Sequence, residues 1–281
     1  MIENKQKQIP NSVWRSKSAN QRGVTRYDRH EDGQTTIYIS GSPITTSKLK
    51  KADCDTLINE LTSRITTWGT RNLSYMARVR IINSILMGII SFWTRIFILP
   101  KQVIKRVMAM CRNFLWSSNH EYIKTPLVNW EEVCQEKKFV GLGIKNASNW
   151  NKATIMKLNW DVADKKDMVW VKWIHGRYIK GEDYWEHKLK QDACHYWREM
   201  TRVRDKFIMM PRGKPYSISD GYRWLQGSME IAKWSGYIWN KSTPPKFKFV
   251  IWLLMKGRMQ TKERLSKYIK LETDCVMWIG Y

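Results

Sequence analysis

Residues Leu73–Trp116 decide the fold, and they read LSYMARVRIINSILMGIISFWTRIFILPKQVIKRVMAMCRNFLW. After Ser74, apolar residues recur every three or four positions: Val79, Ile82, Leu86 and Ile89. This spacing predicts an amphipathic helix with Ser74 as its N-cap. Leu99-Pro100 ends that helix, because proline cannot continue it, and Pro100 suits the first turn of a third helix that runs to Phe114.

Upstream of this stretch, a second apolar stripe has helical spacing: Cys54, Leu57, Ile58, Leu61, Ile65 and Trp68. It predicts the first helix of the bundle. Asp53 and Asp55 stand at its start, where carboxylates complement the helix dipole and face different directions. We therefore do not expect them to bind a metal ion together.

The pattern L-S-Y-x-x-R-x-x-I-I-N-S-x-L of residues 73–86 strongly resembles the thumb region of plant LINE-type (non-LTR) retrotransposon reverse transcriptases. Further motifs continue the resemblance at the expected spacings: Gly41-Ser42-Pro43-Ile44, Trp93, Leu99-Pro100, Phe114-Leu115-Trp116, Trp130, Gly141-Leu142-Gly143 and Asn149-Trp150-Asn151-Lys152-Ala153. The resemblance implies a parent RNA-directed DNA polymerase. The aromatic-Ala-Asp-Asp tetrad that carries the polymerase carboxylates in that family does not occur here, so we expect no enzymatic activity and no catalytic residue.

The stretch Tyr237–Leu265 resembles the opening of the zinc-binding domain of the same family. It contains Trp239, Pro244-Pro245-Lys246 and a basic segment, and Cys275 follows. The resemblance places a second cysteine three residues later, where this chain has Trp278. Because a structural zinc site needs four ligands, we expect Cys275 to be a remnant ligand position, the module to be truncated at Tyr281, and no cofactor to bind.

The resemblance and the periodicity together predict a mainly α-helical protein. We expect a disordered tail over residues 1–36, a thumb-like helical bundle over 37–145, a Trp-rich helical connector over 146–210 and a truncated zinc-binding module over 216–281. The sixteen tryptophans are scattered, which favours core packing over base stacking.

The cysteines indicate a reducing compartment. Five of them are widely spaced and never form C-x-x-C, and no apolar signal segment opens the chain. We expect an intracellular protein of the nucleus or cytoplasm that is not secreted. The uncharged stretch Ile81–Thr94 is shorter than the ~20 residues that a spanning helix needs, so we expect no membrane partner. Cys194-His195 is interpreted as a buried thiol beside a surface imidazole, not as a metal site.

The distribution of charge is the strongest physical signal. Lys and Arg outnumber Asp and Glu by 49 to 25, a net charge of +24. Residues 61–120 contain no carboxylate and nine cations: Arg64, Arg71, Arg78, Arg80, Arg95, Lys101, Lys105, Arg106 and Arg112. Such a window favours a phosphate backbone as its partner. We predict that Arg71, Arg78, Lys105 and Arg106 contact the backbone of RNA or DNA, which positions a nucleic acid without reading its sequence.

A second basic patch follows residue 240, with cations Lys241, Lys246, Lys248, Lys256, Arg258, Lys262 and Arg264. Aromatic residues are interleaved with them: Trp239, Phe247, Phe249 and Trp252. That mixture suits single-stranded nucleic acid, but the aromatic spacing also fits a helix core. We favour the core for these rings and the surface for the lysines.

Three functional interpretations remain open. The first is an inactive fragment of a retroelement reverse transcriptase that retains sequence-independent nucleic-acid binding. The second is a non-enzymatic helical protein-interaction module. The third is an inert product of a decayed element. We expect no small-molecule substrate under any of them.

Overall fold

The structure is a computed structural model that describes residues 25–29, 35–39, 42–44, 49–191, 193–259 and 261. The chain divides into two compact units, Met1–Thr46 and Ser47–Tyr281. The first contains a three-stranded antiparallel sheet of β1 (Thr25–Arg29), β2 (Thr35–Ile39) and β3 (Ser42–Ile44), in the order β1-β2-β3.

This sheet departs from two expectations. Strand β1 lies inside the range 1–36 that the sequence analysis assigned to a tail, and the rest of that range up to Thr35 lies outside the described residues. Strand β3 coincides with Ser42–Ile44 of the Gly41–Ile44 motif, inside the range 37–145 that was expected to be helical, and Ser42 pairs with Ile39 of β2. Strand pairing depends on a partner elsewhere in the chain, so short strands leave a weak local signal.

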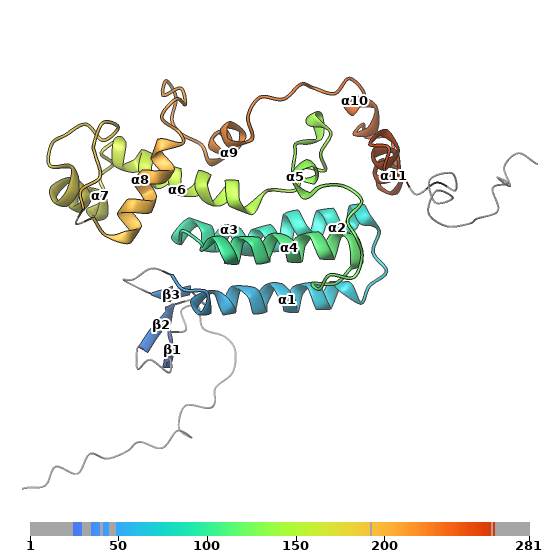
Figure 1. The fold of residues 1–281 in the computed structure, drawn as a ribbon, viewed down its shortest axis with the longest axis horizontal. Helices are drawn as coiled ribbons and strands as arrows, with labels where there is room; N and C mark the ends of the chain where they lie inside the picture. The colour runs from blue at the N-terminus through green and yellow to red at the C-terminus, as the bar shows by residue number, and fades with distance from the viewer. Residues whose placement is uncertain are drawn as a thin grey trace, which may run out of the picture. The chain divides into compact units, whose positions relative to one another are not determined.

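The second unit begins with the helical layer that the sequence predicted (Figure 1). A 3₁₀ turn, η1 (Ala52–Cys54), leads into α1 (Asp55–Gly69). A continuous helix follows, made of α2 (Tyr75–Ile81), the π-helical turn η2 (Ile82–Leu86) and α3 (Met87–Ile96). After the break at Leu99-Pro100, α4 (Lys101–Ser117) packs against both α1 and α2.

The local signals behind this layer are confirmed. The Ser74 hydroxyl accepts a hydrogen bond from the Ala77 amide at 3.3 Å, which makes Ser74 the N-cap of α2. The predicted apolar stripe of α1 is buried, except that Trp68 is half-buried. Asp53 is buried and accepts from the Lys50 amide at 2.6 Å, whereas Asp55 is exposed, so the two carboxylates do point apart.

The other described residues of the second unit are mainly helical or lie in the loops between helices. It contains α5 (Trp130–Val133), the 3₁₀ turn η3 (Lys137–Phe139), α6 (Ala147–Ala163), α7 (Val169–Ile174), the π-helical turn η4 (His175–Ile179), α8 (His195–Asp205), α9 (Ile218–Gln226), α10 (Ser235–Ile238) and α11 (Pro245–Met255). The helical prediction for the connector and for the resembling segments is therefore confirmed.

Two apolar cores hold this unit together. The first runs from Leu49 to Ala147 and also takes in Phe249, Trp252 and Leu253 of α11. The second runs from Ile155 to Tyr216. Several tryptophans pack in these cores, as the sequence predicted: Trp93, Trp116, Trp130, Trp160, Trp197 and Trp252. Burying such large side chains contributes much of the driving force for folding.

The continuous helix Tyr75–Ile96 is long and apolar enough to cross a membrane, with a mean hydropathy of 1.3 in its most apolar window. It extends beyond both ends of the uncharged stretch Ile81–Thr94 considered in the sequence, and so includes Arg80 and Arg95. Its apolar composition has another explanation, because Ile82, Leu86 and Ile90 are fully buried in the first core. A core helix of this kind carries the same composition as a spanning one.

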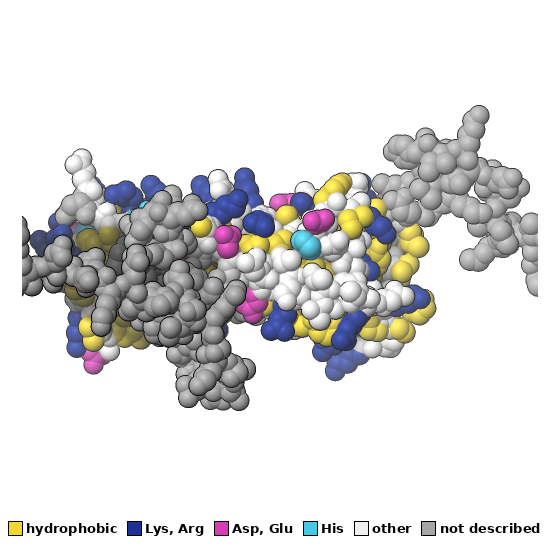
Figure 2. All heavy atoms as spheres, turned by 90° about the horizontal axis from the view of Figure 1, so that it is seen from below, with side chains coloured by type: hydrophobic (Ala, Val, Ile, Leu, Met, Phe, Trp, Pro, Cys, Tyr) yellow, Lys and Arg dark blue, Asp and Glu magenta, His cyan; other side chains and the backbone are white. Residues whose placement is uncertain are grey.

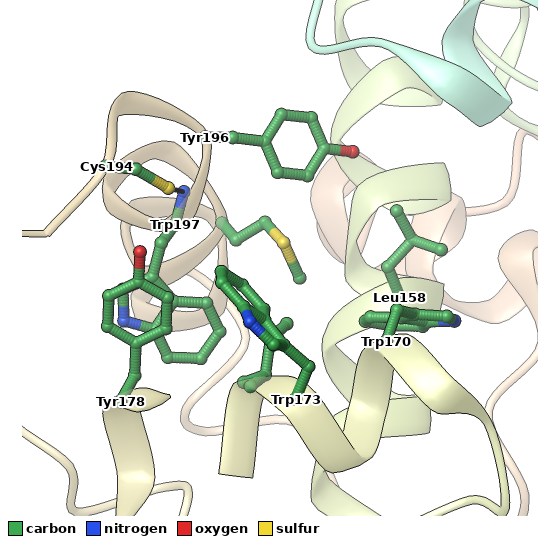
Figure 3. A pocket seen from close by; sticks show the side chains of 9 residues that line it. Leu158, Trp170, Trp173, Tyr178, Cys194, Tyr196 and Trp197 are labelled. Atoms are coloured by element: carbon green, nitrogen blue, oxygen red, sulfur yellow. Dashed lines mark hydrogen bonds between the residues drawn. The ribbon is translucent and has the colours of Figure 1, made fainter. Parts of the chain in front are cut away.

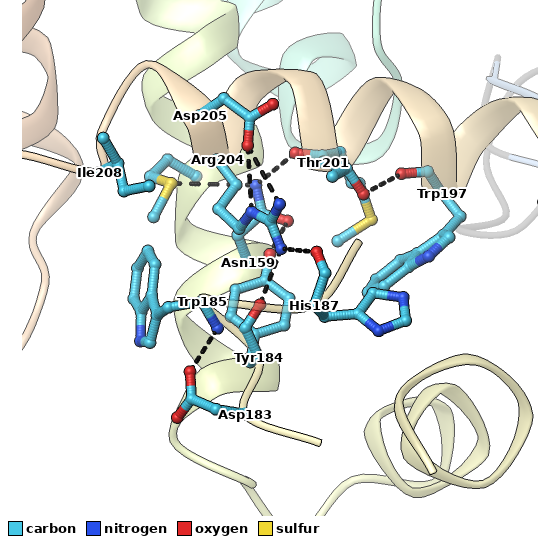
Figure 4. A network of polar contacts seen from close by, with 12 residues as sticks. Asn159, Asp183, Tyr184, Trp185, His187, Trp197, Thr201, Arg204, Asp205 and Ile208 are labelled. Atoms are coloured by element: carbon cyan, nitrogen blue, oxygen red, sulfur yellow. Dashed lines mark hydrogen bonds and ion pairs between the residues drawn. The ribbon is translucent and has the colours of Figure 1, made fainter. Parts of the chain in front are cut away.

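A buried arginine fixes the irregular segment between η4 and α8 (Figure 4). Arg204 is 6% exposed, and its Nη1 donates to the carbonyl oxygens of Tyr184 at 2.7 Å and His187 at 2.9 Å. The Tyr184 hydroxyl donates to Asn159 Oδ1 of α6 at 2.7 Å. Because buried polar groups are costly when unpartnered, this network holds the segment against α6 and α8.

We expect Gly141→Ala to destabilise the protein by about 2 kcal/mol, because a Cβ atom at Gly141 would lie 2.0 Å from the backbone oxygen of Gln135. The turn between Gln135 and Gly143 would have to open. This would disturb the hydrogen bond that the Gly143 amide donates to the same oxygen at 2.8 Å. Urea denaturation measures the loss. Gly88→Ala is the control, since nothing lies within 4 Å of a Cβ there; within a helix it should be neutral or slightly stabilising. Equal stability of the two variants would contradict this account of the turn.

Candidate nucleic-acid interface

The nine cations of residues 61–120 are carried by the helical layer α1–α4 and its connections. Seven are exposed: Arg64, Arg71, Arg80, Arg95, Lys101, Lys105 and Arg106. Within the described part of the chain, none of the nine forms an ion pair with a carboxylate. The connector differs, since Lys157 and Lys166 both pair with Asp161 at 3.1 and 2.5 Å. The layer therefore carries positive charge that the described carboxylates do not neutralise.

The exposed cations extend along the layer. Lys105 and Arg106 are neighbours near the start of α4. Arg71 lies near the other end of that helix, since a Cβ at Gly69 would be 2.3 Å from the Ser118 oxygen. At ~1.5 Å per residue, Lys105 and Ser118 are about 20 Å apart. The predicted residues thus form an extended set, and on the face seen in Figure 2 Lys and Arg gather near the edges with few Asp or Glu among them.

Arg78 differs from the other three predicted residues. It is half-buried, and its Nη1 donates to the Leu115 carbonyl oxygen at 2.9 Å. Its guanidinium also lies over the Tyr75 ring at 4.8 Å. Burial lowers the pKa of Arg78 from its ordinary value. Arg78 therefore ties α2 to the end of α4, whereas Arg71, Lys105 and Arg106 are exposed.

The segment after residue 215 packs on the earlier helices at several points. The Tyr216 hydroxyl donates to the Ala153 carbonyl oxygen at 2.8 Å. The Tyr222 hydroxyl accepts from the Asn146 amide at 2.8 Å. Both contacts attach the start of this segment to α6, against which α9 packs closely.

The end of the same segment enters the first core. The Phe249 ring stacks on Tyr75 at 4.4 Å between centroids. The Trp252 indole N–H donates to the Val140 carbonyl oxygen at 2.7 Å, and Lys256 pairs with Glu132 at 2.6 Å. The expectation that the aromatic residues are core therefore holds for Phe249 and Trp252, but Phe247 is 55% exposed.

A cavity of ≈ 270 Å³ lies between α6, α7 and α8 (Figure 3). Apolar and aromatic side chains line it: Leu158, Trp170, Trp173, Ile174, Tyr178, Cys194, Tyr196, Trp197 and Met200. The lining contains no carboxylate or imidazole. The prediction of a buried thiol at Cys194 is wrong, because this residue is the exposed N-cap of α8. Whether the Cys194 side chain is exposed depends on how the neighbouring helices pack. The sequence around Cys194 does not predict that packing.

The described residues do not form a metal site. Among them, no three His, Cys, Asp or Glu side chains lie close enough together to hold an ion. Burial raises the pKa of the Cys54 thiol, which Asp53 and Asp55 raise further, and of the Cys111 thiol, each to about 12; such thiols are poor ligands. Cys275 and Trp278 lie outside the described residues, as do Lys262 and Arg264.

The chain is similar to one protein family and to two plant proteins. Residues 216–279 match the family described as zinc-binding in reverse transcriptase. A putative ribonuclease H protein of Arabidopsis thaliana is 29% identical over 206 residues, which cover 69% of this chain and 30% of that protein. An uncharacterized mitochondrial protein of Arabidopsis thaliana is 24% identical over 126 residues, covering 44% of this chain and 80% of that protein.

The chain is therefore related to reverse transcriptase, as the sequence motifs predicted. It spans 30% of the length of the Arabidopsis ribonuclease H-like relative. The family model implies zinc, and the described residues of the matched segment do not supply a ligand set for it. The described residues of the matched segment include α9 and α11, and these helices pack against the rest of the unit.

Proposed function

We propose that this chain derives from a LINE-type retrotransposon reverse transcriptase and binds nucleic acid without sequence preference, without catalysing polymerisation itself. One observation carries the proposal: the helical layer has seven exposed cations, its sixty-residue window has no carboxylate, and none of the seven forms an ion pair with a described carboxylate. A nucleic-acid backbone supplies regularly spaced negative charge, and the extended set along α1–α4 suits it better than a compact anion.

The proposed partner is a template–primer duplex gripped along the backbone. Arg71, Lys105 and Arg106 are the proposed contacts, because they are exposed. Arg71 also lies over the Trp68 ring at 4.5 Å, which orients its guanidinium. Contacts of this kind give affinity that depends on salt and little on sequence.

We expect Arg71→Ala, Lys105→Ala and Arg106→Ala, combined, to weaken binding of an RNA–DNA duplex on the order of 30-fold at low salt, and to lower the salt slope by about three. Fluorescence anisotropy of labelled duplex at two salt concentrations measures both. The control is the combined change of Lys188, Lys190 and Lys214 to Ala, which removes the same charge from exposed positions outside the layer. Equal losses in both variants would reduce the proposal to a net-charge effect, and no binding by the wild type would overturn it.

A second candidate is protein interaction through the cavity of Figure 3. Large apolar side chains near it are exposed, with Val169 at 87% and Trp173 at 58%, and exposed apolar surface of this kind is common at interfaces. Salt separates the two candidates, because apolar contact does not weaken as salt rises, whereas phosphate contact does.

A further inference from the structure

Two elements that are far apart in the sequence meet beside the first core. Turn η3 carries Lys137, and α11 carries Lys248. The Trp252–Val140 hydrogen bond holds α11 against the end of η3. Lys248 precedes Trp252 by one helical turn, so it lies on the face of α11 that is turned toward η3.

The two lysines form a like-charge pair. Desolvation lowers the pKa of Lys137, and the positive charge of Lys248 lowers it further. No carboxylate among the described residues forms an ion pair with either lysine. The carboxylate of the neighbouring Glu136 pairs instead with Lys138 Nζ at 3.1 Å and with Arg223 Nε at 3.5 Å. An anion placed between the two ammonium groups would relieve their repulsion.

One aromatic ring contacts Lys137, and a second is exposed next to Lys248 in the sequence. The Lys137 ammonium group lies 5.0 Å from the centroid of the Trp239 ring. Phe247 directly precedes Lys248 and is 55% exposed, although it belongs to a helix whose other rings are buried. An exposed ring near cations that pair with no described carboxylate suits a base together with its phosphate.

The loop between α10 and α11 is fixed in shape. Asn240 Nδ2 donates to the Tyr237 carbonyl oxygen at 2.6 Å, and its Oδ1 accepts from the Thr243 amide at 2.8 Å. Lys241 lies in this loop and is exposed, as is Lys246 at the start of α11. The additional cations are thus presented on a preformed turn, which lowers the entropic cost of binding.

We infer that Lys137, Lys248 and Phe247 form a second site that binds single-stranded nucleic acid, with the phosphate between the lysines and an unpaired base on the Phe247 ring. The inference rests on the proposed function and adds to it a surface distinct from the cations of α1–α4. The bases of a duplex are paired and stacked on one another, so they are not available to stack on the Phe247 ring. The proposed ligand is therefore a single strand. Both RNA and DNA carry the required phosphate and base.

The test uses the full chain and labelled single strands of about twelve nucleotides, oligouridylate and oligothymidylate, with an RNA–DNA duplex alongside. Phe247→Ala should weaken binding of the single strands about tenfold and leave duplex binding within twofold. Lys137→Gln with Lys248→Gln should lower the salt slope for single strands by about 0.7, the value for the one phosphate that is no longer neutralised. Phe247→Trp should restore binding.

Leu254→Ala is the matched control, since Leu254 lies on the same helix, is 57% exposed and should leave binding unchanged. Duplex binding that depends on Arg71, Lys105 and Arg106, with single-strand binding unaffected by Phe247→Ala, would overturn this inference alone. Loss of single-strand binding in Phe247→Ala without any duplex binding would support the second site and reject the first. Binding of phosphatidylserine vesicles, but not of RNA, that is lost in Phe247→Ala would assign the surface to a membrane instead.

Discussion

Trp252→Ala is expected to lower the free energy of unfolding by about 5 kcal/mol, the largest loss that we predict from one substitution. Trp252 is fully buried in the first core, although it belongs to the segment that matches the zinc-binding family. Truncation of a buried tryptophan costs about 3–5 kcal/mol. It would also leave the Val140 carbonyl oxygen without the N–H that it accepts at 2.7 Å. Urea denaturation followed by circular dichroism measures the change.

Two variants separate the causes of this effect. Trp252→Phe keeps a large ring but removes the N–H donor, and should cost about 1–2 kcal/mol. Leu254→Ala changes an exposed residue of the same helix and should cost little. Hydrogen exchange then tests the connection between the segments: amides of α2 and α4 should lose protection in Trp252→Ala. Unchanged protection there would mean that α11 is an independent module, against the core that it shares with those helices.

Local patterns in the sequence predicted the helical layer well. The stripe from Cys54 to Ile65, the Ser74 cap and the break at Leu99-Pro100 all lie where the sequence placed them. Helical periodicity and capping act within a few residues, so a single sequence contains the information they need.

Contacts between distant residues were not predictable in the same way. Lys137 and Lys248 belong to different segments, and no pattern within either one shows that they meet. Arg78 is a similar case, because its charge suggested a phosphate contact while its hydrogen bond to Leu115 depends on how α4 ends beside α2. A charge pattern identifies a basic surface but does not tell which cations the fold itself uses.

Asn151 shows how a family motif can reflect packing. It lies within the Asn149–Ala153 motif that the sequence analysis matched to the family, and its side chain is 4% exposed. Its Oδ1 accepts from the Leu99 amide at 3.0 Å, and its Nδ2 donates to the carbonyl oxygens of Phe97 at 2.9 Å and Thr94 at 3.3 Å. One side chain therefore satisfies three backbone groups at the break between α3 and α4 and joins them to α6.

Asn151→Ala should accordingly destabilise the protein by about 3–4 kcal/mol, because the backbone groups at the break would stay buried without partners. Asn151→Asp should not restore stability, since a carboxylate can accept from Leu99 but cannot donate to Phe97 or Thr94. Asn149→Ala is the control: this side chain is only half-buried, so its loss should cost less than about 0.5 kcal/mol. Chemical denaturation of the three variants measures the difference. If Asn151→Ala were as stable as Asn149→Ala, the break between α3 and α4 would not depend on α6, and the orientation of Lys105 and Arg106 on α4 would need another explanation.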